Sequence, residues 1–394
     1  MRILQISKYP PIEGGTSVAC YWLAQSLAEL GHEITVLTNA DEVEDEYRIN
    51  FAQDDIPLLR GYRKRNCLNL ISTQRDASHN FIPQTNPYLS KLLGLGLNFI
   101  KNNKVDLIWA HYVEPYGIAA LALSQLTGIP YIIQHAGSDL GRLGLTSSLS
   151  GLYAEVYRHA MKIITSRQHN HYFTSLGVKT AALFNDGLFF LPGDVFFPTP
   201  PTRSNTLRLL NYGKAASTKG STDLVHALSS LEREGIDVKL TAYWGGSNLR
   251  EIRRLICDSA IADNTLVING FVPHWRIAEA IRESDAVAYL ERNFSITAHR
   301  PIIPIETLGC GRILITTSEI ASKPNVAPLI TSDNTIIADD TVGLADALKR
   351  LAHLKKYPDL TQFPDISLLN AYGINNLEAL LADIATIHER AAVR

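Results

Sequence analysis

Two successive series of alternating apolar strands and helices predict an α/β protein of two Rossmann-like domains, each built on a doubly wound parallel sheet. The first series opens with a strand over 2–7, a turn that holds Gly14 and Gly15, and a helix over 16–30. The second series opens at Leu207, after a proline-rich stretch. A chain of 394 residues also exceeds one ordinary core, since domains contain roughly 100–200 residues. Ligands of such sheets bind beyond the carboxyl ends of the strands, so the cleft between the domains is the predicted site.

The elements of the first domain follow from their apolar spacing and their stop signals. The helix over 16–30 carries apolar side chains at helical spacing and stops at Gly31-His32. A strand over 33–38 then completes a β-α-β unit. The further elements expected in this domain are a strand over 107–110, a helix over 117–126 and a strand over 131–134.

The second domain repeats this alternation. Its expected strands lie over 207–212, 238–243, 265–267, 286–289 and 312–316, with helices over 220–234, 248–259, 275–283 and 301–308. We therefore divide the chain into an N-terminal domain over 1–195, a linker over 196–205, a C-terminal domain over 206–368 and a helical segment over 369–394. The last segment is expected to pack back on the N-terminal domain.

The composition argues against several classes of protein. A net charge of −2 argues against general nucleic-acid binding. The four cysteines form no C-x-x-C pair, so we expect neither a zinc site nor a disulfide framework, and a reducing cytoplasm as the location. No run of about 18 apolar residues is present, and the apolar start of the chain is too short for the core of a signal peptide. We also expect no metal site and no cofactor.

The stretch over 206–220 is the most informative local signal for a ligand. An apolar strand leads into Gly213-Lys214, and Lys219-Gly220 opens the next helix. Glycine allows close approach of the backbone, a helix N-terminus offers free N–H groups with a positive dipole end, and the lysines add two cations. The stretch therefore predicts an anion site, with two solvated loop lysines as the alternative.

The order of the motifs resembles the retaining glycosyltransferases of family 4 (glycosyl transferases group 1), which have the GT-B fold of two facing Rossmann-like domains. The resemblance spans nearly the whole chain. It rests on Pro11-Ile12-Glu13-Gly14-Gly15, Gly31-His32, His135-Ala136-Gly137-Ser138-Asp139, Gly213-Lys214 with Lys219-Gly220, Asn269-Gly270-Phe271-Val272, and Pro304-Ile305-Glu306 with Gly309 and Gly311. It implies a nucleotide sugar of the UDP or GDP type on the C-terminal domain and an acceptor on the N-terminal domain.

The resemblance assigns the diphosphate of the donor to Lys214 and Lys219. Lys214 stands where the family usually has Arg, so it is expected to neutralise phosphate but to orient it less tightly. Glu306 matches the carboxylate that accepts hydrogen bonds from the ribose hydroxyls, a task that suits two acceptor oxygens. A charged residue exposed on a helix is the alternative for Glu306. Gly213 and Gly220 complete the phosphate turn.

The remaining donor contacts include one departure from the family pattern. Gly270, Phe271 and Val272 resemble the segment whose backbone meets the base, with a plain turn after a strand as the alternative. Ser295 fits the pattern, but Ala298 stands where the first Glu of the Glu-x7-Glu motif is expected. That loss puts both the identity of the donor sugar and the activity itself in doubt. His299 and Arg300 follow directly and are expected either to contact the sugar or phosphates or to be solvated loop residues.

The N-terminal domain supplies the other face of the predicted site. His135 follows a strand and matches the family histidine that faces the donor sugar, with a buried structural histidine as the alternative. Asp139 is expected to orient this imidazole or to bind acceptor hydroxyls, and His111 to line the acceptor pocket. Gly14 and Gly15 are expected to let a loop close over the phosphates and acceptor, or to make a tight turn.

The resulting prediction is a metal-independent, retaining glycosyltransferase that acts in polysaccharide or glycolipid synthesis by front-face transfer. The alternatives are a UDP-sugar epimerase or hydrolase of the same fold, and a non-catalytic module that binds sugar nucleotides, which Ala298 favours. The acceptor is a saccharide or a lipid-linked saccharide. A basic cluster at Arg60, Arg63 and Arg65, with leucines over 92–97 nearby, is a candidate for peripheral contact with the inner face of a membrane, although a solvated loop and a core helix explain it too.

Overall fold

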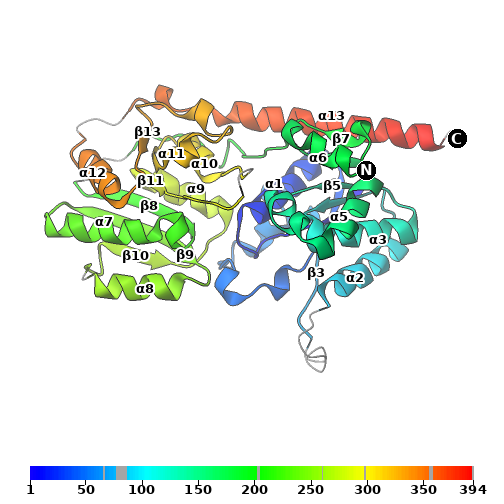
Figure 1. Ribbon diagram of the computed structural model, residues 1–394, viewed down its shortest axis with the longest axis horizontal. Coiled ribbons are helices and arrows are strands. Elements are labelled where there is room, and N and C mark those ends of the chain that lie inside the picture. The colour runs from blue at the N-terminus through cyan, green and yellow to red at the C-terminus, as the bar shows by residue number, and fades with distance from the viewer. Residues whose placement is uncertain are drawn as a thin grey trace.

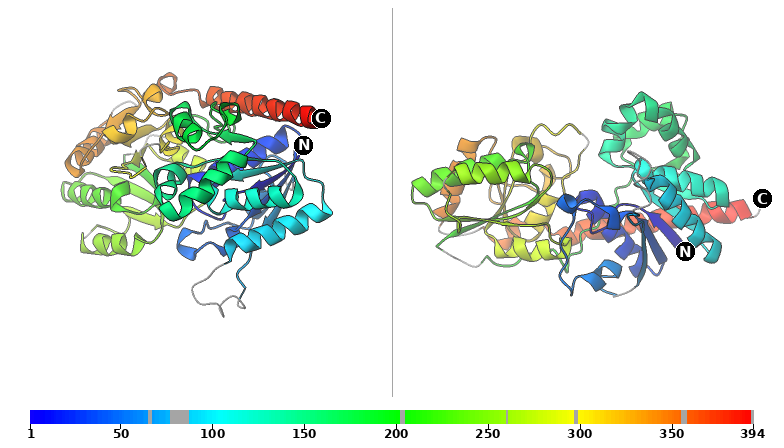
Figure 2. Two further views of the ribbon diagram at one scale, coloured as in Figure 1. Left: turned by 45° about the vertical axis from the view of Figure 1, so that its right-hand side comes forward. Right: turned by 90° about the horizontal axis from the view of Figure 1, so that it is seen from below.

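The computed structural model describes residues 1–64, 67–76, 87–201, 205–259, 261–296, 299–354 and 358–392, with the side chains of the last helix described as far as Ile387. Two all-parallel sheets form two lobes, and helices cover their faces (Figures 1 and 2). The first sheet has seven strands in the order β3-β2-β1-β4-β5-β6-β7, and the second has six in the order β10-β9-β8-β11-β12-β13. The predicted fold of two facing Rossmann-like domains is confirmed.

The first lobe contains the following elements. Its strands are β1 (Arg2–Ile6), β2 (Glu33–Thr38), β3 (Leu68–Ser72), β4 (Leu107–His111), β5 (Tyr131–Gln134), β6 (Lys162–Ile164) and β7 (Leu183–Phe184). Its helices are α1 (Gly15–Glu29), α2 (Tyr88–Asn102), α3 (Ile118–Thr127), α4 (Gly137–Gly141), α5 (Ser147–His159) and α6 (Asn170–Ser175).

The second lobe begins at β8 and is followed by one long terminal helix. Its strands are β8 (Leu207–Lys214), β9 (Val238–Gly245), β10 (Leu266–Asn269), β11 (Ala286–Tyr289), β12 (Ile313–Thr316) and β13 (Thr335–Ile337). Its helices are α7 (Ser221–Arg233), α8 (Leu249–Asp258), α9 (His274–Glu283), α10 (Ile303–Gly309), α11 (Ser318–Ala321) and α12 (Thr341–Ala352), and the chain ends in α13 (Ile366–Ala392).

Strand β8 extends further than its apolar pattern predicts, and this extension determines the position of Lys214, the first lysine of the predicted phosphate turn. Gly213 and Lys214 still pair with Trp244 and Gly245 of β9, although neither residue has an apolar side chain. The strand can continue because its ladder is made by the backbone, which does not depend on side-chain type. Lys214 therefore lies at the carboxyl end of β8, the edge of the sheet where ligands bind.

Helix α13 ties the two lobes together. It extends along the top of the molecule from the second lobe to the first (Figure 1). Leu377, Leu380 and Ile384 are buried in a cluster that includes side chains of both lobes. Lys162 of β6 contacts the Asp383 carboxylate at 2.5 Å. The apolar cluster fixes the helix, and the ion pair fixes its position along the N-terminal sheet.

Candidate active site between the domains

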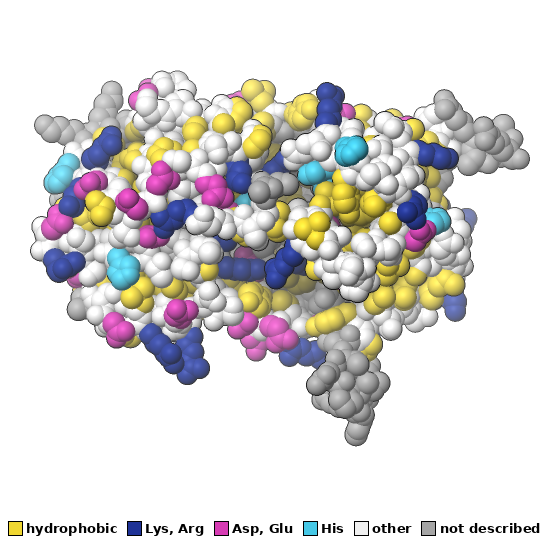
Figure 3. Space-filling view, in the orientation of Figure 1, with side chains coloured by type: hydrophobic (Ala, Val, Ile, Leu, Met, Phe, Trp, Pro, Cys, Tyr) yellow, Lys and Arg dark blue, Asp and Glu magenta, His cyan; other side chains and the backbone are white. Residues whose placement is uncertain are grey.

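A cavity of about 810 Å³ lies between the lobes and is lined by side chains of both. Figure 3 shows a hollow at this place with basic side chains along it. Twelve predicted site residues line the cavity: Gly14, Gly15, His111, His135, Gly213, Lys214, Lys219, Phe271, Val272, His299, Arg300 and Glu306. The tertiary structure thus brings together residues from the start, the middle and the C-terminal half of the chain.

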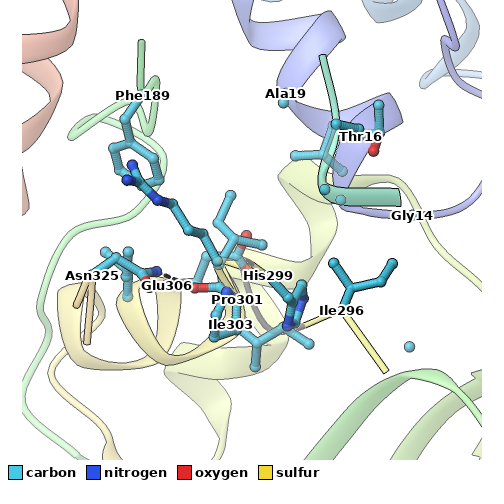
Figure 4. Close-up of a pocket in the computed structure, with 18 of the residues that line it drawn as sticks. Gly14, Thr16, Ala19, Phe189, Ile296, His299, Pro301, Ile303, Glu306 and Asn325 are labelled. Atoms are coloured by element: carbon cyan, nitrogen blue, oxygen red, sulfur yellow. Dashed lines mark hydrogen bonds between the residues drawn. The ribbon is translucent and has the colours of Figure 1, made fainter. Parts of the chain in front are cut away.

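The Gly14-Gly15 turn presents the beginning of α1 to this cavity. Gly14 has φ 122°, a conformation that favours glycine, and no neighbouring atom lies within 4 Å of a Cβ built there. No acidic side chain occupies the first turn of α1, so its N-terminal N–H groups keep their attraction for an anion. Gly14, Thr16 and Ala19 reach the cavity from this side, opposite His299 and Glu306 (Figure 4).

The two predicted phosphate lysines each have a carboxylate partner. Lys214 Nζ lies 3.4 Å from Glu13 Oε2, an ion pair across the cleft, and 5.0 Å from the centre of the Tyr47 ring. Lys219 contacts the fully buried carboxylate of Glu291, with the Phe294 ring centre 4.7 Å away. The carboxylates of Glu13 and Glu291 therefore hold the two lysines at the cavity. A diphosphate bound there would have to compete with these carboxylates for the lysines or share the lysines with them.

Glu291 was not predicted from the sequence, although it is the best-buried acid of the site. It is the second residue after β11, its side chain is fully buried, and Oε1 lies 2.9 Å from His299 Nδ1. Burial, together with Lys219 and Lys323, lowers the pKa of His299 to about 4. A charged residue within two positions of the end of a buried parallel strand was the signal that could have revealed Glu291.

Glu306 lies in α10 at the floor of the cavity, and its residue is only 1% exposed. Tyr212 donates its hydroxyl to Oε2 at 2.5 Å, and His274 Nε2 lies 2.5 Å from Oε1. Exposure on a helix, the alternative considered for Glu306, is excluded. Because a carboxylate oxygen can accept two hydrogen bonds, each oxygen keeps capacity for a further donor from the cavity. Tyr212 and His274 were not predicted as site residues, because neither has a local motif.

The two histidines of the N-terminal wall are neutral near pH 7. Burial lowers the pKa of His135 to about 4, and His169 and Arg300 oppose its protonation further. Its Nε2 lies 2.8 Å from Thr165 Oγ1, and its Nδ1 lies 3.3 Å from the Ala136 carbonyl. Burial also lowers the pKa of His111 to about 3, and His111 Nδ1 has no hydrogen-bond partner among the residues that the structure describes. A neutral, unpartnered ring nitrogen suits a hydroxyl group.

Asp139 is fully buried and does not line the cavity. Its Oδ2 accepts the backbone N–H groups of Ala136 at 2.8 Å and Val113 at 3.2 Å. Burial outweighs these two bonds and raises the pKa of the carboxyl to about 7. The structure therefore places this side chain under the loop that carries His135, outside the lining of the cavity.

Gly220, Gly270 and Ser295 also lie outside the lining. Gly220 has φ 77°, and a Cβ there would come within 2.3 Å of Leu290 Cβ, so the glycine is required for packing. A Cβ at Gly270 would lie 2.5 Å from Asn50 Nδ2 of the other lobe. Ser295 is exposed, and Ala298 lies outside the described residues.

The basic segment proposed for membrane contact is engaged within the protein at Arg63, whereas Arg60 is exposed. Arg63 forms ion pairs with Glu29 and Asp194. Leu92 is fully buried, and the other apolar side chains of α2 pack against the same core. Arg65 lies outside the described residues. None of the helices in the described part of the chain combines the length and apolar character needed to cross a bilayer.

Among the residues that the structure describes, no group of three or more His, Cys, Asp and Glu side chains is placed to hold a metal ion. The charges that face the cavity come from side chains such as Lys214, Lys219 and Arg300.

The chain is similar to known glycosyltransferases in sequence. Residues 14–182 match the family model of the glycosyl transferase 4-like domain. An uncharacterized glycosyltransferase of Methanocaldococcus jannaschii is 29% identical over 153 residues, which are 39% of this chain and 36% of that relative. The N-acetyl-alpha-D-glucosaminyl L-malate synthase of Bacillus anthracis is 23% identical over 319 residues, 78% of this chain and 76% of that relative.

Solved structures share the fold at low sequence identity. The sucrose-phosphate synthase of Thermosynechococcus elongatus has a TM-score of 0.61 and 16% identity, over 100% of this chain and 98% of that chain. Anabaena HepE in complex with UDP-glucose has a TM-score of 0.61 and 14% identity, over 100% of both chains.

Proposed function

The chain is a glycosyltransferase family 4-like protein with a GT-B fold, and on this premise we propose that it transfers a sugar from a nucleotide sugar to a hydroxyl of an acceptor with retention of configuration. The acceptor in this proposal is a saccharide or a lipid-linked saccharide. The nucleotide is of the UDP or GDP type, and the complex of HepE with UDP-glucose favours UDP.

One observation carries the proposal. The lysine pair and Glu306 of the C-terminal domain line the same cavity as His135 and the Gly14-Gly15 turn of the N-terminal domain. Cations beside a free helix N-terminus suit a diphosphate, and a carboxylate with remaining acceptor capacity suits the ribose hydroxyls. Facing neutral histidines suit an uncharged sugar.

The proposed reaction needs no protein nucleophile. The acceptor oxygen attacks the anomeric carbon on the side of the leaving group, the bond from that carbon to the diphosphate oxygen breaks, and the hydroxyl proton passes to the diphosphate. Lys214 and Lys219 stabilise the charge that develops on the leaving diphosphate. Positioning of the two substrates in one cavity supplies the rest of the rate enhancement.

No cofactor or metal ion enters this proposal, because the two lysines supply the positive charge at the diphosphate. Transfer measured in the presence of EDTA should equal transfer with added Mg²⁺ or Mn²⁺. A requirement for either ion would contradict this part of the proposal.

Calorimetric titration with UDP, GDP and their sugars tests the donor site. Lys214→Ala and Glu306→Gln should each weaken the preferred nucleotide by about tenfold or more, the usual effect of losing one hydrogen bond to a charged group. Lys239→Ala is the matched control, because Lys239 lies on the same sheet, is exposed and does not line the cavity. If the first two variants bind every nucleotide as well as the parent does, the assignment of the donor site is wrong.

An assay of donor alone separates the proposal from its alternatives. An epimerase would return an altered nucleotide sugar without any acceptor, and a hydrolase would release free sugar. A binding module would bind the donor but give no product with a broad panel of saccharide and glycolipid acceptors.

Co-sedimentation with anionic vesicles tests whether a lipid-linked acceptor brings the protein to a membrane surface. Binding that does not change in Arg60→Ala would count against contact through the basic segment.

A further inference from the structure

A buried line of hydrogen bonds connects the N-terminal domain to Glu306. The indole Nε1–H of Trp22, in α1, donates to His274 Nδ1 at 2.7 Å. His274, in α9 of the other domain, places Nε2 at 2.5 Å from Glu306 Oε1. The three residues are 2%, 8% and 1% exposed, so water does not compete for these bonds.

The direction of each bond follows from the chemistry of its donor. An indole nitrogen can only donate, so His274 Nδ1 must be the acceptor and carries no proton. The proton of the imidazole is therefore on Nε2, and it is donated to Glu306 Oε1. Trp22 thus selects the tautomer of His274 that can support the carboxylate.

Glu306 is consequently held from two sides. Tyr212 fixes Oε2 from within the same domain, whereas His274 fixes Oε1 through a contact that continues into the other domain. The His274 ring has little room to turn, since the Phe196 ring centre lies 4.8 Å away and the Trp22 ring centre 6.0 Å away. A separation of the domains would remove Trp22 and free the imidazole to rotate or change its tautomer.

We propose that His274 and Trp22 are positioning residues that couple the orientation of Glu306, and hence recognition of the nucleotide's ribose, to the arrangement of the two domains. The inference rests on the proposed function, in which Glu306 accepts hydrogen bonds from the ribose hydroxyls. It predicts that the ribose is recognised best when the N-terminal domain is in contact with α9.

The test measures the ratio of the dissociation constants of 2′,3′-dideoxy-UDP and UDP by calorimetry. The parent should prefer UDP by about tenfold or more, as expected for hydrogen bonds to a charged acceptor. Trp22→Phe keeps the ring contact but removes the N–H, and should lower this ratio to about a third of the parent value or less, a loss in the range of one hydrogen bond. His274→Leu should lower it at least as much. His274→Gln should restore part of it, because an amide can both accept and donate.

Trp275→Phe is the matched control. The Trp275 indole also donates across the domain interface, to Asp55 Oδ1 at 2.8 Å, but it does not lead to Glu306. Because Trp275→Phe removes one hydrogen bond across the interface but leaves the Trp22, His274 and Glu306 bonds in place, its ratio should equal that of the parent.

The outcomes separate the inference from its premise. A parent protein that binds both nucleotides equally overturns the role of Glu306 in the proposed function, and the inference with it. A parent that prefers UDP, with Trp22→Phe and His274→Leu at the same ratio, overturns only the coupling. An equal fall of the ratio in Trp275→Phe and Trp22→Phe also overturns it, because the effect would then not pass through His274.

Discussion

Replacing Lys219 with methionine should separate the stability of this site from its function. Methionine keeps most of the length and the contact with Phe294 but removes the charge that faces Glu291. The Glu291 carboxylate is fully buried and would keep only His299 Nδ1, at 2.9 Å, among its charge partners. With the pKa of His299 lowered to about 4 by burial, this imidazole is neutral at pH 7 and compensates little.

The expected loss of unfolding free energy in Lys219→Met is about 3 kcal/mol, the lower part of the range for breaking a buried ion pair on one side. Adding Glu291→Gln removes the stranded charge, so the double variant should return to within about 1 kcal/mol of the parent. Neither variant regains the cation that meets the diphosphate in the proposed function. Both should bind UDP about 10- to 100-fold more weakly, the equivalent of one charged hydrogen bond.

Urea denaturation at pH 7 gives the stabilities, and calorimetry with UDP gives the affinities. Glu291→Gln alone is the control, since it keeps Lys219 and should retain UDP binding. A double variant that recovers UDP affinity together with stability would refute the assignment of Lys219 to the diphosphate. A Lys219→Met variant as stable as the parent would refute the claim that Glu291 depends on this lysine.

Three further substitutions test the surroundings of the site. Burial raises the pKa of Asp139 to about 7, so between about pH 4 and 7 the folded chain binds a proton that the unfolded chain lacks, and stability falls as the pH rises. Asp139→Asn should remove this pH dependence, which is worth up to about 4 kcal/mol, and should be more stable than the parent at pH 8. Urea denaturation at pH 5 and pH 8 gives the free energies of unfolding, and an equal change between the two pH values in parent and variant would contradict this. Gly220→Ala should lose about 3 kcal/mol in thermal unfolding, because φ is 77° and its Cβ would lie 2.3 Å from Leu290 Cβ, whereas an unchanged Tm would show that Leu290 moves aside at little cost. Asp383→Ala should lose about 1 kcal/mol of unfolding free energy, because the Lys162 ammonium, 8% exposed, would keep the Ala181 carbonyl as its remaining partner. No loss would mean that the apolar face of α13 holds this helix in place without the ion pair.

The sequence predicted the elements that have strong periodicity and clear stops. The helix over 16–30 is α1 within one residue at each end, and the strand over 33–38 is β2 without change. Short edge strands were not predicted: β7 has two residues and β13 three, too few to show a period of two. Segments that hold these strands are specified mainly by their neighbours in the sheet, which no local pattern reveals.

The sequence by itself determined the two Rossmann-like domains and the end of each sheet at which a ligand binds, because periodicity and glycine turns are local properties of the chain. It also predicted that Lys214, Lys219 and Glu306 belong to one site, and all three line the cavity between the domains. Only the tertiary structure decided what holds them. Trp22 and His274 are 252 positions apart and meet across a domain interface, and Glu291 reaches Lys219 from the loop after β11. Such contacts depend on how strands are ordered and how the domains face each other, so they leave no signal at any fixed spacing in the sequence.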